Sequence, residues 1–193
     1  MLLLGHTAPA FSSQAVVQNK VVPNFSLGSL LNQYVVLFFY PLDFTFVCPT
    51  ELHAFQEQLV AFQERGVSVV GCSVDSVYSH LAWLHTSREK GGIEGITYPL
   101  VSDMNKSIAR SYHVLDEAAG IAYRGLFIID PKGIVRYQQV NDLPIGRSVE
   151  ETLRIIDALL FHAAHGDVCP ANWHKGQKTM KPSQAGLAEF FSH

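Results

Sequence analysis

The chain has 193 residues, of which 48% are hydrophobic and 16% are charged, and its formal net charge is −3. This length fits one domain, or one domain with a tail, and it buries enough surface to fold without disulfide or metal staples. The small negative charge offers no basic field for polyanions, so nucleic-acid binding is excluded as the main role.

The first half of the chain predicts strands that alternate with helices. Continuous apolar runs at residues 34–40 and 67–74 predict buried strands. Between these strands Pro49 opens a helix that Gly66 closes. The apolar stripe of this helix, on a 3.6-residue period, consists of Leu52, Phe55, Leu59 and Phe62. A further helix is predicted at residues 79–90, where two glycines follow it.

The second half continues the alternation and then adds a hairpin. The predicted elements are a short strand at 99–101, a helix at 107–112, strands at 126–129 and 134–140, and a helix at 148–162. A turn at residues 130–133 joins the last two strands, and Ser148 with Glu151 forms a capping box for the last helix. The pattern predicts an α/β fold with a mixed sheet.

The helical and strand patterns end at Gly166. Prolines and glycines punctuate the remaining residues without a clear apolar period. We therefore predict a domain at residues 1–165 and a C-terminal arm at residues 166–193.

Neither the apolar runs nor the start of the chain indicates a membrane or secretory segment. The longest apolar run, residues 35–40, is far shorter than the roughly 18 residues of a membrane span. Residues 1–6 contain no lysine or arginine, and their apolar run is too short for a signal peptide. We expect a cytoplasmic protein without a membrane partner.

The chain contains three cysteines, Cys48, Cys72 and Cys169. An odd, low number without a C-x-x-C pair does not form a disulfide framework, and it disfavours both a thioredoxin-type reductase and a zinc ribbon. In a reducing compartment such cysteines are either small buried hydrophobes or reactive thiols. Cys72 lies inside a continuous apolar strand, so we expect it to be a structural thiol.

Cys48 is the candidate reactive thiol because it lies at the start of the helix that Pro49 opens. Free backbone N–H groups and the positive end of the helix favour thiolate over thiol there. The preceding loop follows the carboxyl end of a strand, where open α/β sheets bind ligands. Thr45 can direct a hydroxyl toward whatever approaches the sulfur. The alternative is that Cys48 is a buried spacer.

Several segments resemble one protein family. Residues 41–51 (PLDFTFVCPTE) resemble the active-site segment of the peroxiredoxins, with its signature P-x-x-x-T-x-x-C. Residues 123–130 and 168–173 resemble the active-site arginine and resolving-cysteine segments of the typical two-cysteine subgroup, the alkyl hydroperoxide reductase and thiol-specific antioxidant family. Residues 71–76 and 146–151 fit as well. The resemblance covers the chain from about Gly5 to Phe191.

The resemblance implies a thioredoxin-like fold, with a central mixed β-sheet flanked by helices and an extended C-terminal arm. It implies an antioxidant thiol peroxidase that reduces hydrogen peroxide and organic hydroperoxides. Cys48 is then the peroxidatic nucleophile, and Arg124 offers a fixed charge and forked donors to the peroxide. Thr45 bonds the sulfur and the peroxide, and Pro41 shields the pocket. No cofactor and no metal are implied.

The remaining implied roles concern support and turnover. Glu51 and Arg147 orient Arg124. Cys169 of the partner subunit resolves the Cys48 sulfenic acid into an intersubunit disulfide. A thioredoxin-like protein or a flavin-linked disulfide reductase then reduces this disulfide. The expected assembly is a homodimer, joined further into a decamer of five dimers, with the strand at residues 134–140 at the dimer edge.

Two other questions stay open from the sequence. A ring-forming holdase chaperone with regulatory thiols is the alternative function. Overoxidation of Cys48 is the second question, because residues 91–95 and the pair Phe190-Phe191 resemble segments of peroxide-sensitive relatives but depart from them at Glu94 and Phe190. We expect intermediate sensitivity.

Overall fold

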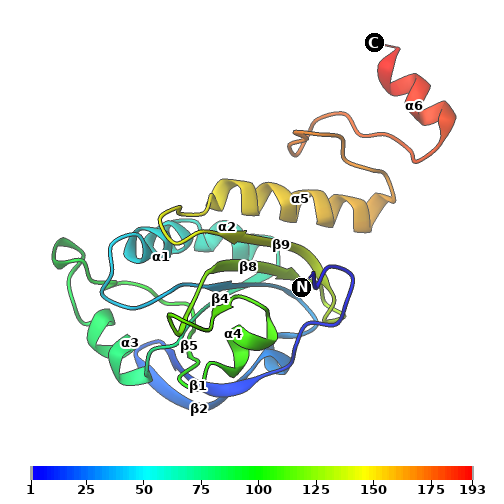
Figure 1. Ribbon diagram of the computed structural model, residues 1–193. Coiled ribbons are helices and arrows are strands. Elements are labelled where there is room, and N and C mark those ends of the chain that lie inside the picture. Colours follow the sequence, from blue (N-terminus) through cyan, green and yellow to red (C-terminus); the bar gives the residue numbers. More distant parts are fainter. Residues whose placement is uncertain (1, 193) are drawn as a thin grey trace. The chain divides into compact units, whose positions relative to one another are not determined.

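The computed structural model describes residues 2–192, and the chain divides into two compact units between Arg147 and Ser148. Figure 1 shows the helices and strands. The strands are β1 (Ser12–Val17), β2 (Lys20–Ser26), β3 (Tyr34–Phe39), β4 (Val67–Ser73), β5 (Leu100–Ser102), β6 (Leu115–Asp116), β7 (Ile121–Ala122), β8 (Arg124–Ile129) and β9 (Val135–Asn141). The helices are α1 (Cys48–Glu57), α2 (Leu59–Glu64), α3 (Val77–Leu84), α4 (Ser107–Ser111), α5 (Val149–His165) and α6 (Gln184–Phe191), with 3₁₀ turns at Leu27–Leu30 and Arg88–Lys90.

The first unit is built on a seven-stranded sheet in the order β2-β1-β5-β4-β3-β8-β9. Strands β3, β4 and β5 run parallel to one another, whereas β8 pairs antiparallel with both β3 and β9, and β1 pairs antiparallel with β5. The predicted mixed sheet is therefore confirmed. Strand β9 lies at one edge of this sheet, as expected for the segment 134–140.

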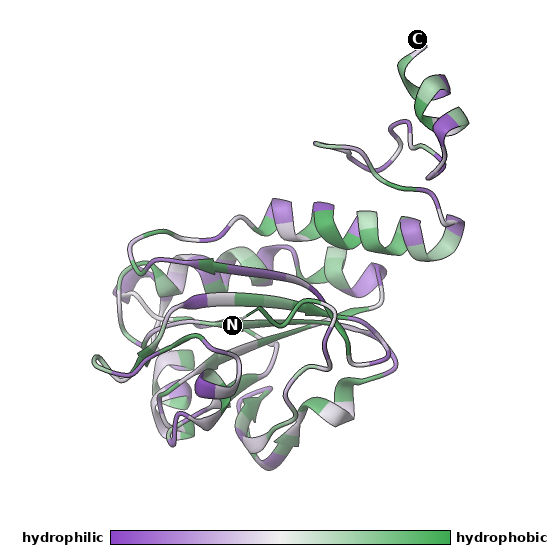
Figure 2. Ribbon diagram, turned by 45° about the vertical axis from the view of Figure 1, so that its right-hand side comes forward, coloured by the Kyte–Doolittle hydropathy of each residue, from purple (hydrophilic) through white to green (hydrophobic). Residues whose placement is uncertain are grey.

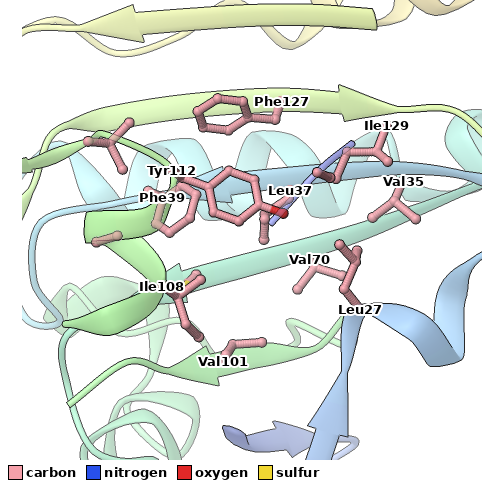
Figure 3. Packing of buried hydrophobic residues seen from close by; sticks show 14 of the residues in the cluster. Leu27, Val35, Leu37, Phe39, Val70, Val101, Ile108, Tyr112, Phe127 and Ile129 are labelled. Atoms are coloured by element: carbon pink, nitrogen blue, oxygen red, sulfur yellow. The ribbon is translucent and has the colours of Figure 1, made fainter. Parts of the chain in front are cut away.

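Alternate residues of β3 pack into two different cores because successive strand side chains point to opposite faces. Val35, Leu37 and Phe39 belong to a cluster with the residues of β8 and α4 that Figure 3 shows. On the opposite face, Phe38 stacks on Phe55 of α1, with ring centroids 4.4 Å apart. The central strand thus fixes the helix that begins at Cys48.

Aromatic rings join the sheet to α4 in the first core. Tyr112, which follows α4, lies 5.3 Å from Phe39 and 4.9 Å from Phe127 by ring centroids (Figure 3). All three side chains are fully buried. Figure 2 colours the chain by hydropathy, and hydrophobic residues predominate along the central strands.

Two predicted helices differ from the observed ones. The helix expected from Pro49 to Gly66 is interrupted at Gln58, where the backbone turns to φ −100° and ψ 7°. Neither glycine nor proline marks this break, and the apolar stripe is buried on both sides of it. The helix expected at 79–90 begins earlier, at Val77, because Ser76 Oγ accepts the Ser79 N–H, and it ends at Leu84.

Several elements were missed by the sequence prediction. Strands β1 and β2 form a hairpin whose residues are mostly half-buried or exposed, so their apolar signal is weak. Helix α6 is capped by Ser183, whose Oγ accepts the Gly186 N–H, but its eight residues are too few for a clear period. Within residues 2–192, no helix combines the length and apolarity that a membrane crossing needs.

The second unit begins with α5, and Ser148 caps this helix as predicted, because its Oγ accepts the Glu151 N–H. Helix α5 ends at His165, and Gly166 follows it with a left-handed φ of 73°. The sequence assigned α5 to the domain and residues 166–193 to an arm, whereas the compact units divide before α5. The predicted boundary at residue 165 stays a prediction.

Truncation of Phe127 tests the first core. Phe127→Ala removes a fully buried ring that contacts two others, so we expect the free energy of unfolding to fall by about 3–5 kcal/mol. Val60→Ala, on an exposed side chain of α2, is the control and is expected to change it by less than about 0.5 kcal/mol. Urea denaturation followed by circular dichroism measures both, and equal losses would contradict the assigned core.

Candidate functional site

Cys48 is the first residue of α1, one position beyond the N-cap residue Val47. Its side chain is fully buried. Pro49 follows in the first turn, where the missing N–H leaves no hydrogen bond unmade. The predicted placement of Cys48 next to the helix N-cap is therefore confirmed, and the sulfur lies where the helix dipole favours negative charge.

Arg124, the first residue of β8, brings a guanidinium to this sulfur. Its Nη1 lies 3.4 Å from Cys48 Sγ and donates to Glu51 Oε2 at 2.7 Å. Its Nε donates to the backbone oxygen of Leu143 at 2.6 Å. The guanidinium is thereby fixed from two sides, with one N–H group directed at the sulfur.

Glu51 lies one turn after Cys48 on α1 and joins Arg124 to a second arginine. Arg147 donates to the Glu51 carboxylate from its backbone N and from Nε and Nη2, at 2.7 to 2.9 Å. Its Nη1 donates to the backbone oxygens of Phe39 and Gly125. All three ionic side chains are nearly inaccessible to solvent.

These charges leave a net positive charge beside Cys48. Two guanidinium groups share one carboxylate, so the buried cluster carries one positive charge in excess. A buried cation attracts a nearby anion much more strongly than an exposed one, because little water screens it. The cluster therefore places an excess positive charge close to the Cys48 sulfur.

The loop between β3 and α1 carries the other two predicted site residues. Pro41 is buried, and Thr45 is half-buried. Thr45 Oγ1 donates to the backbone oxygen of Leu42 at 2.8 Å, within the loop. The sequence placed both residues on this loop correctly. It gave no sign of the Leu143 and Gly125 carbonyls, which reach the site from distant segments.

The other two cysteines have different surroundings. Cys72 is fully buried on β4, and burial raises the pKa of its thiol, with the Asp103 carboxylate adding to the effect. This confirms the expectation of a buried thiol. Cys169 belongs to the second unit and is half-buried, with Sγ 3.8 Å from the backbone oxygen of Ala158. Burial also raises the pKa of Cys169, and Arg154 opposes the rise.

Eight of the nine histidines lie in the described part of the chain, and they form no metal centre there. Across residues 2–192, no group of three or more His, Cys, Asp or Glu side chains is arranged to hold a metal ion.

Comparisons with known proteins identify the family of the chain. Residues 4–138 match the AhpC/TSA family, and residues 158–193 match the C-terminal domain of 1-Cys peroxiredoxin. A thioredoxin peroxidase of Echinococcus granulosus is 50% identical over 190 residues, which cover 98% of each chain. The mitochondrial thioredoxin-dependent peroxide reductase of Mus musculus is 53% identical over 95% of this chain and 71% of its own length.

A solved structure matches the whole chain. The reduced 2-Cys peroxiredoxin of Plasmodium vivax superposes with a TM-score of 0.96 at 48% identity and covers all of both chains. The fold is thioredoxin-like, and together with the site it defines a thiol-dependent peroxidase. The chain belongs to the AhpC/TSA family and is a peroxiredoxin.

Removal of the Glu51 charge tests the buried cluster. Glu51→Gln leaves two buried guanidinium groups without a counter-charge, so we expect the free energy of unfolding to fall by about 3–5 kcal/mol. Glu57→Gln is the matched control on the same helix, because Glu57 pairs with Arg88 at the surface and contributes less than about 1 kcal/mol. Guanidinium denaturation compares the two variants, and a loss no larger for Glu51→Gln would refute the assigned role.

Proposed function

We propose that this peroxiredoxin reduces hydrogen peroxide and organic hydroperoxides with Cys48 as the peroxidatic nucleophile. The observation that carries the proposal is the 3.4 Å contact between Arg124 Nη1 and Cys48 Sγ. The Cys48 thiolate attacks one peroxide oxygen, the O–O bond breaks, and Cys48 becomes a sulfenic acid. The leaving oxygen departs as water or an alcohol after it takes up a proton.

The surrounding side chains act on the charge that moves during this step. Negative charge passes from the sulfur to the leaving oxygen, and donors fixed along that path stabilise the transition state. Arg124 supplies such donors, and Glu51 with Arg147 holds its guanidinium in place. Thr45 offers a hydroxyl from the loop, and Pro41 shields the pocket from water.

Cys169 completes the proposed cycle. Its thiol condenses with the Cys48 sulfenic acid of the partner subunit, and the new disulfide forms as water leaves. A homodimer supported by pairing of the edge strand β9 with its symmetry mate would bring the two cysteines together. By family resemblance, five such dimers form a decamer.

The reductant in this proposal is a thioredoxin-like dithiol protein, and a flavin-linked disulfide reductase is the other candidate. The names of the relatives, thioredoxin peroxidase and thioredoxin-dependent peroxide reductase, support the first. The proposed location is the cytoplasm, where its three free cysteines would stay reduced. The relatives' names concern peroxidases and add no support to a holdase chaperone.

A non-reducing gel after one equivalent of hydrogen peroxide tests the two cysteine roles. We expect a band at about twice the 21.4 kDa chain mass that dithiothreitol removes, with peptide mapping to Cys48–Cys169. Cys48→Ser should abolish peroxide consumption, Cys169→Ser should keep the first step without the band, and Cys72→Ala should behave as wild type. A Cys48→Ser protein that still consumed peroxide would refute the proposal, and a wild-type protein that consumed no peroxide but suppressed client aggregation would favour the chaperone.

The pH dependence of alkylation tests the state of Cys169. Because burial raises the pKa of this thiol above its ordinary value, the thiolate is a minor form near neutral pH and increases as pH rises. In the Cys48→Ser variant we expect the iodoacetamide rate of Cys169 to rise about tenfold per pH unit between pH 7 and 8.5. Mass spectrometry of the Cys169 peptide measures it, and a rate independent of pH would contradict the raised pKa.

A further inference from the structure

The loop before Cys48 contains a costly backbone conformation. Phe44 has a φ of 55°, in the left-handed region that side chains other than glycine, asparagine and aspartate rarely adopt. Its own side chain is 52% exposed and makes a tilted ring contact with Trp83 at 5.8 Å. Such a conformation persists only where the surroundings impose it. The residues on either side must therefore hold it.

Asp43, directly before Phe44, is fixed by four hydrogen bonds. Its Oδ1 accepts from Tyr40 Oη at 2.9 Å, and its Oδ2 accepts from Ser79 Oγ at 2.7 Å and from His80 Nδ1 at 2.8 Å. Its backbone N–H donates to Asp75 Oδ2 at 2.9 Å. The partners come from the residue after β3, from α3 and from the segment after β4. The loop is thereby tied to three elements of the sheet and its covering layer.

His80 is the fully buried partner of Asp43 in this network. Its side chain is fully buried, with Nδ1 against the Asp43 carboxylate and Nε2 3.3 Å from the backbone oxygen of Val101. A carboxylate and a carbonyl oxygen only accept hydrogen bonds, and a neutral imidazole has a single N–H to donate. His80 Nδ1 therefore donates to the Asp43 carboxylate, which can only accept at this 2.8 Å contact.

Asp75 and Tyr40 also belong to this network. Asp75 brings a second carboxylate to the cluster, and burial followed by the Asp43 charge raises its pKa. Tyr40 donates to Asp43, and burial followed by the same charge raises its pKa strongly. Asp43 and Asp75 thus place two carboxylates around the His80 ring, and the phenol of Tyr40 stays protonated.

We propose that Asp43 and His80 are positioning residues for the reaction with peroxide. Their hydrogen bond holds the left-handed turn at Phe44, which sets the path of the loop from Pro41 to Val47 and the place of the Thr45 hydroxyl. The inference rests on the proposed roles of Cys48 and Thr45. The Cys48 sulfur is contacted by Arg124, which Glu51 holds in place, and these two residues belong to a separate network. Loss of the His80 bond therefore slows the peroxide reaction without a matching change in thiol reactivity.

Two substitutions at His80 distinguish the roles of its two ring nitrogens. His80→Asn places an amide N–H group near the position of Nδ1 and keeps a donor to Asp43. His80→Gln extends to the position of Nε2 and keeps only the donor to the Val101 oxygen. Stopped-flow fluorescence of the reduced full-length chain measures the rate constant with hydrogen peroxide, and iodoacetamide alkylation of Cys48 measures thiol reactivity.

We expect His80→Gln to lower the peroxide rate constant about tenfold or more, while alkylation of Cys48 changes by less than about twofold. His80→Asn is expected to recover the rate to within about threefold of wild type. Equal losses in the two variants, or a parallel loss of alkylation, would overturn the positioning role. If wild type reacted with peroxide no faster than Cys48→Ser, the proposed function itself would have failed.

Milder variants keep the test decisive if the His80 variants do not fold. Tyr40→Phe and Ser79→Ala each remove one donor to Asp43 and are expected to slow the peroxide step about two- to fivefold, with a larger effect together. Ser13→Ala is the control, because its hydroxyl donates to the Ser102 oxygen away from the loop. An unchanged rate in the Tyr40→Phe, Ser79→Ala double variant would overturn the proposal.

Discussion

The Glu51 carboxylate is the group on which the arrangement of the site depends. It accepts hydrogen bonds from both Arg124 and Arg147, and so it joins α1, β8 and the end of the first unit. Arg147 extends the connection to the backbone oxygens of Phe39 and Gly125, at the carboxyl end of β3 and in β8. One buried carboxylate therefore keeps the helix that carries the nucleophile in register with the strand that carries its cationic partner.

Two separate polar networks lie near Cys48, one at its sulfur and one under the preceding loop. The arginine–glutamate cluster places a guanidinium nitrogen 3.4 Å from the sulfur. The network around Asp43 lies under the loop and controls its backbone path. Both are buried and hydrogen-bonded, as polar groups in a low-dielectric interior must be. A peroxidase can then tune thiol reactivity and substrate placement through different residues.

The sequence predicted those parts of the fold and site that depend on local pattern. The strand before Cys48 and the helix after it follow from apolar runs and Pro49, and the family motif supplied Arg124 and Glu51. The carbonyl partners of the arginines could not be predicted, because Leu143 and Gly125 reach the site only through the tertiary fold. The break at Gln58 could not be predicted, because no glycine or proline marks it. The buried contacts of His80 could not be predicted either, because in the sequence it is one polar residue in an amphipathic helix.

The complete burial of Cys48 has a consequence for the timing of the catalytic cycle. A disulfide requires its two Cα atoms to come within roughly 4.4–6.8 Å, and a sulfur sealed under the first turn of α1 offers no such approach. The backbone must open before any second sulfur can reach it. Val47, a poor N-cap residue, makes no side-chain hydrogen bond to that turn, so we expect the opening to begin at the N-terminal end of the helix. In the proposed cycle, capture of peroxide requires this turn to stay folded and formation of the disulfide requires it to open, so the opening equilibrium of the turn would set the time between the two steps.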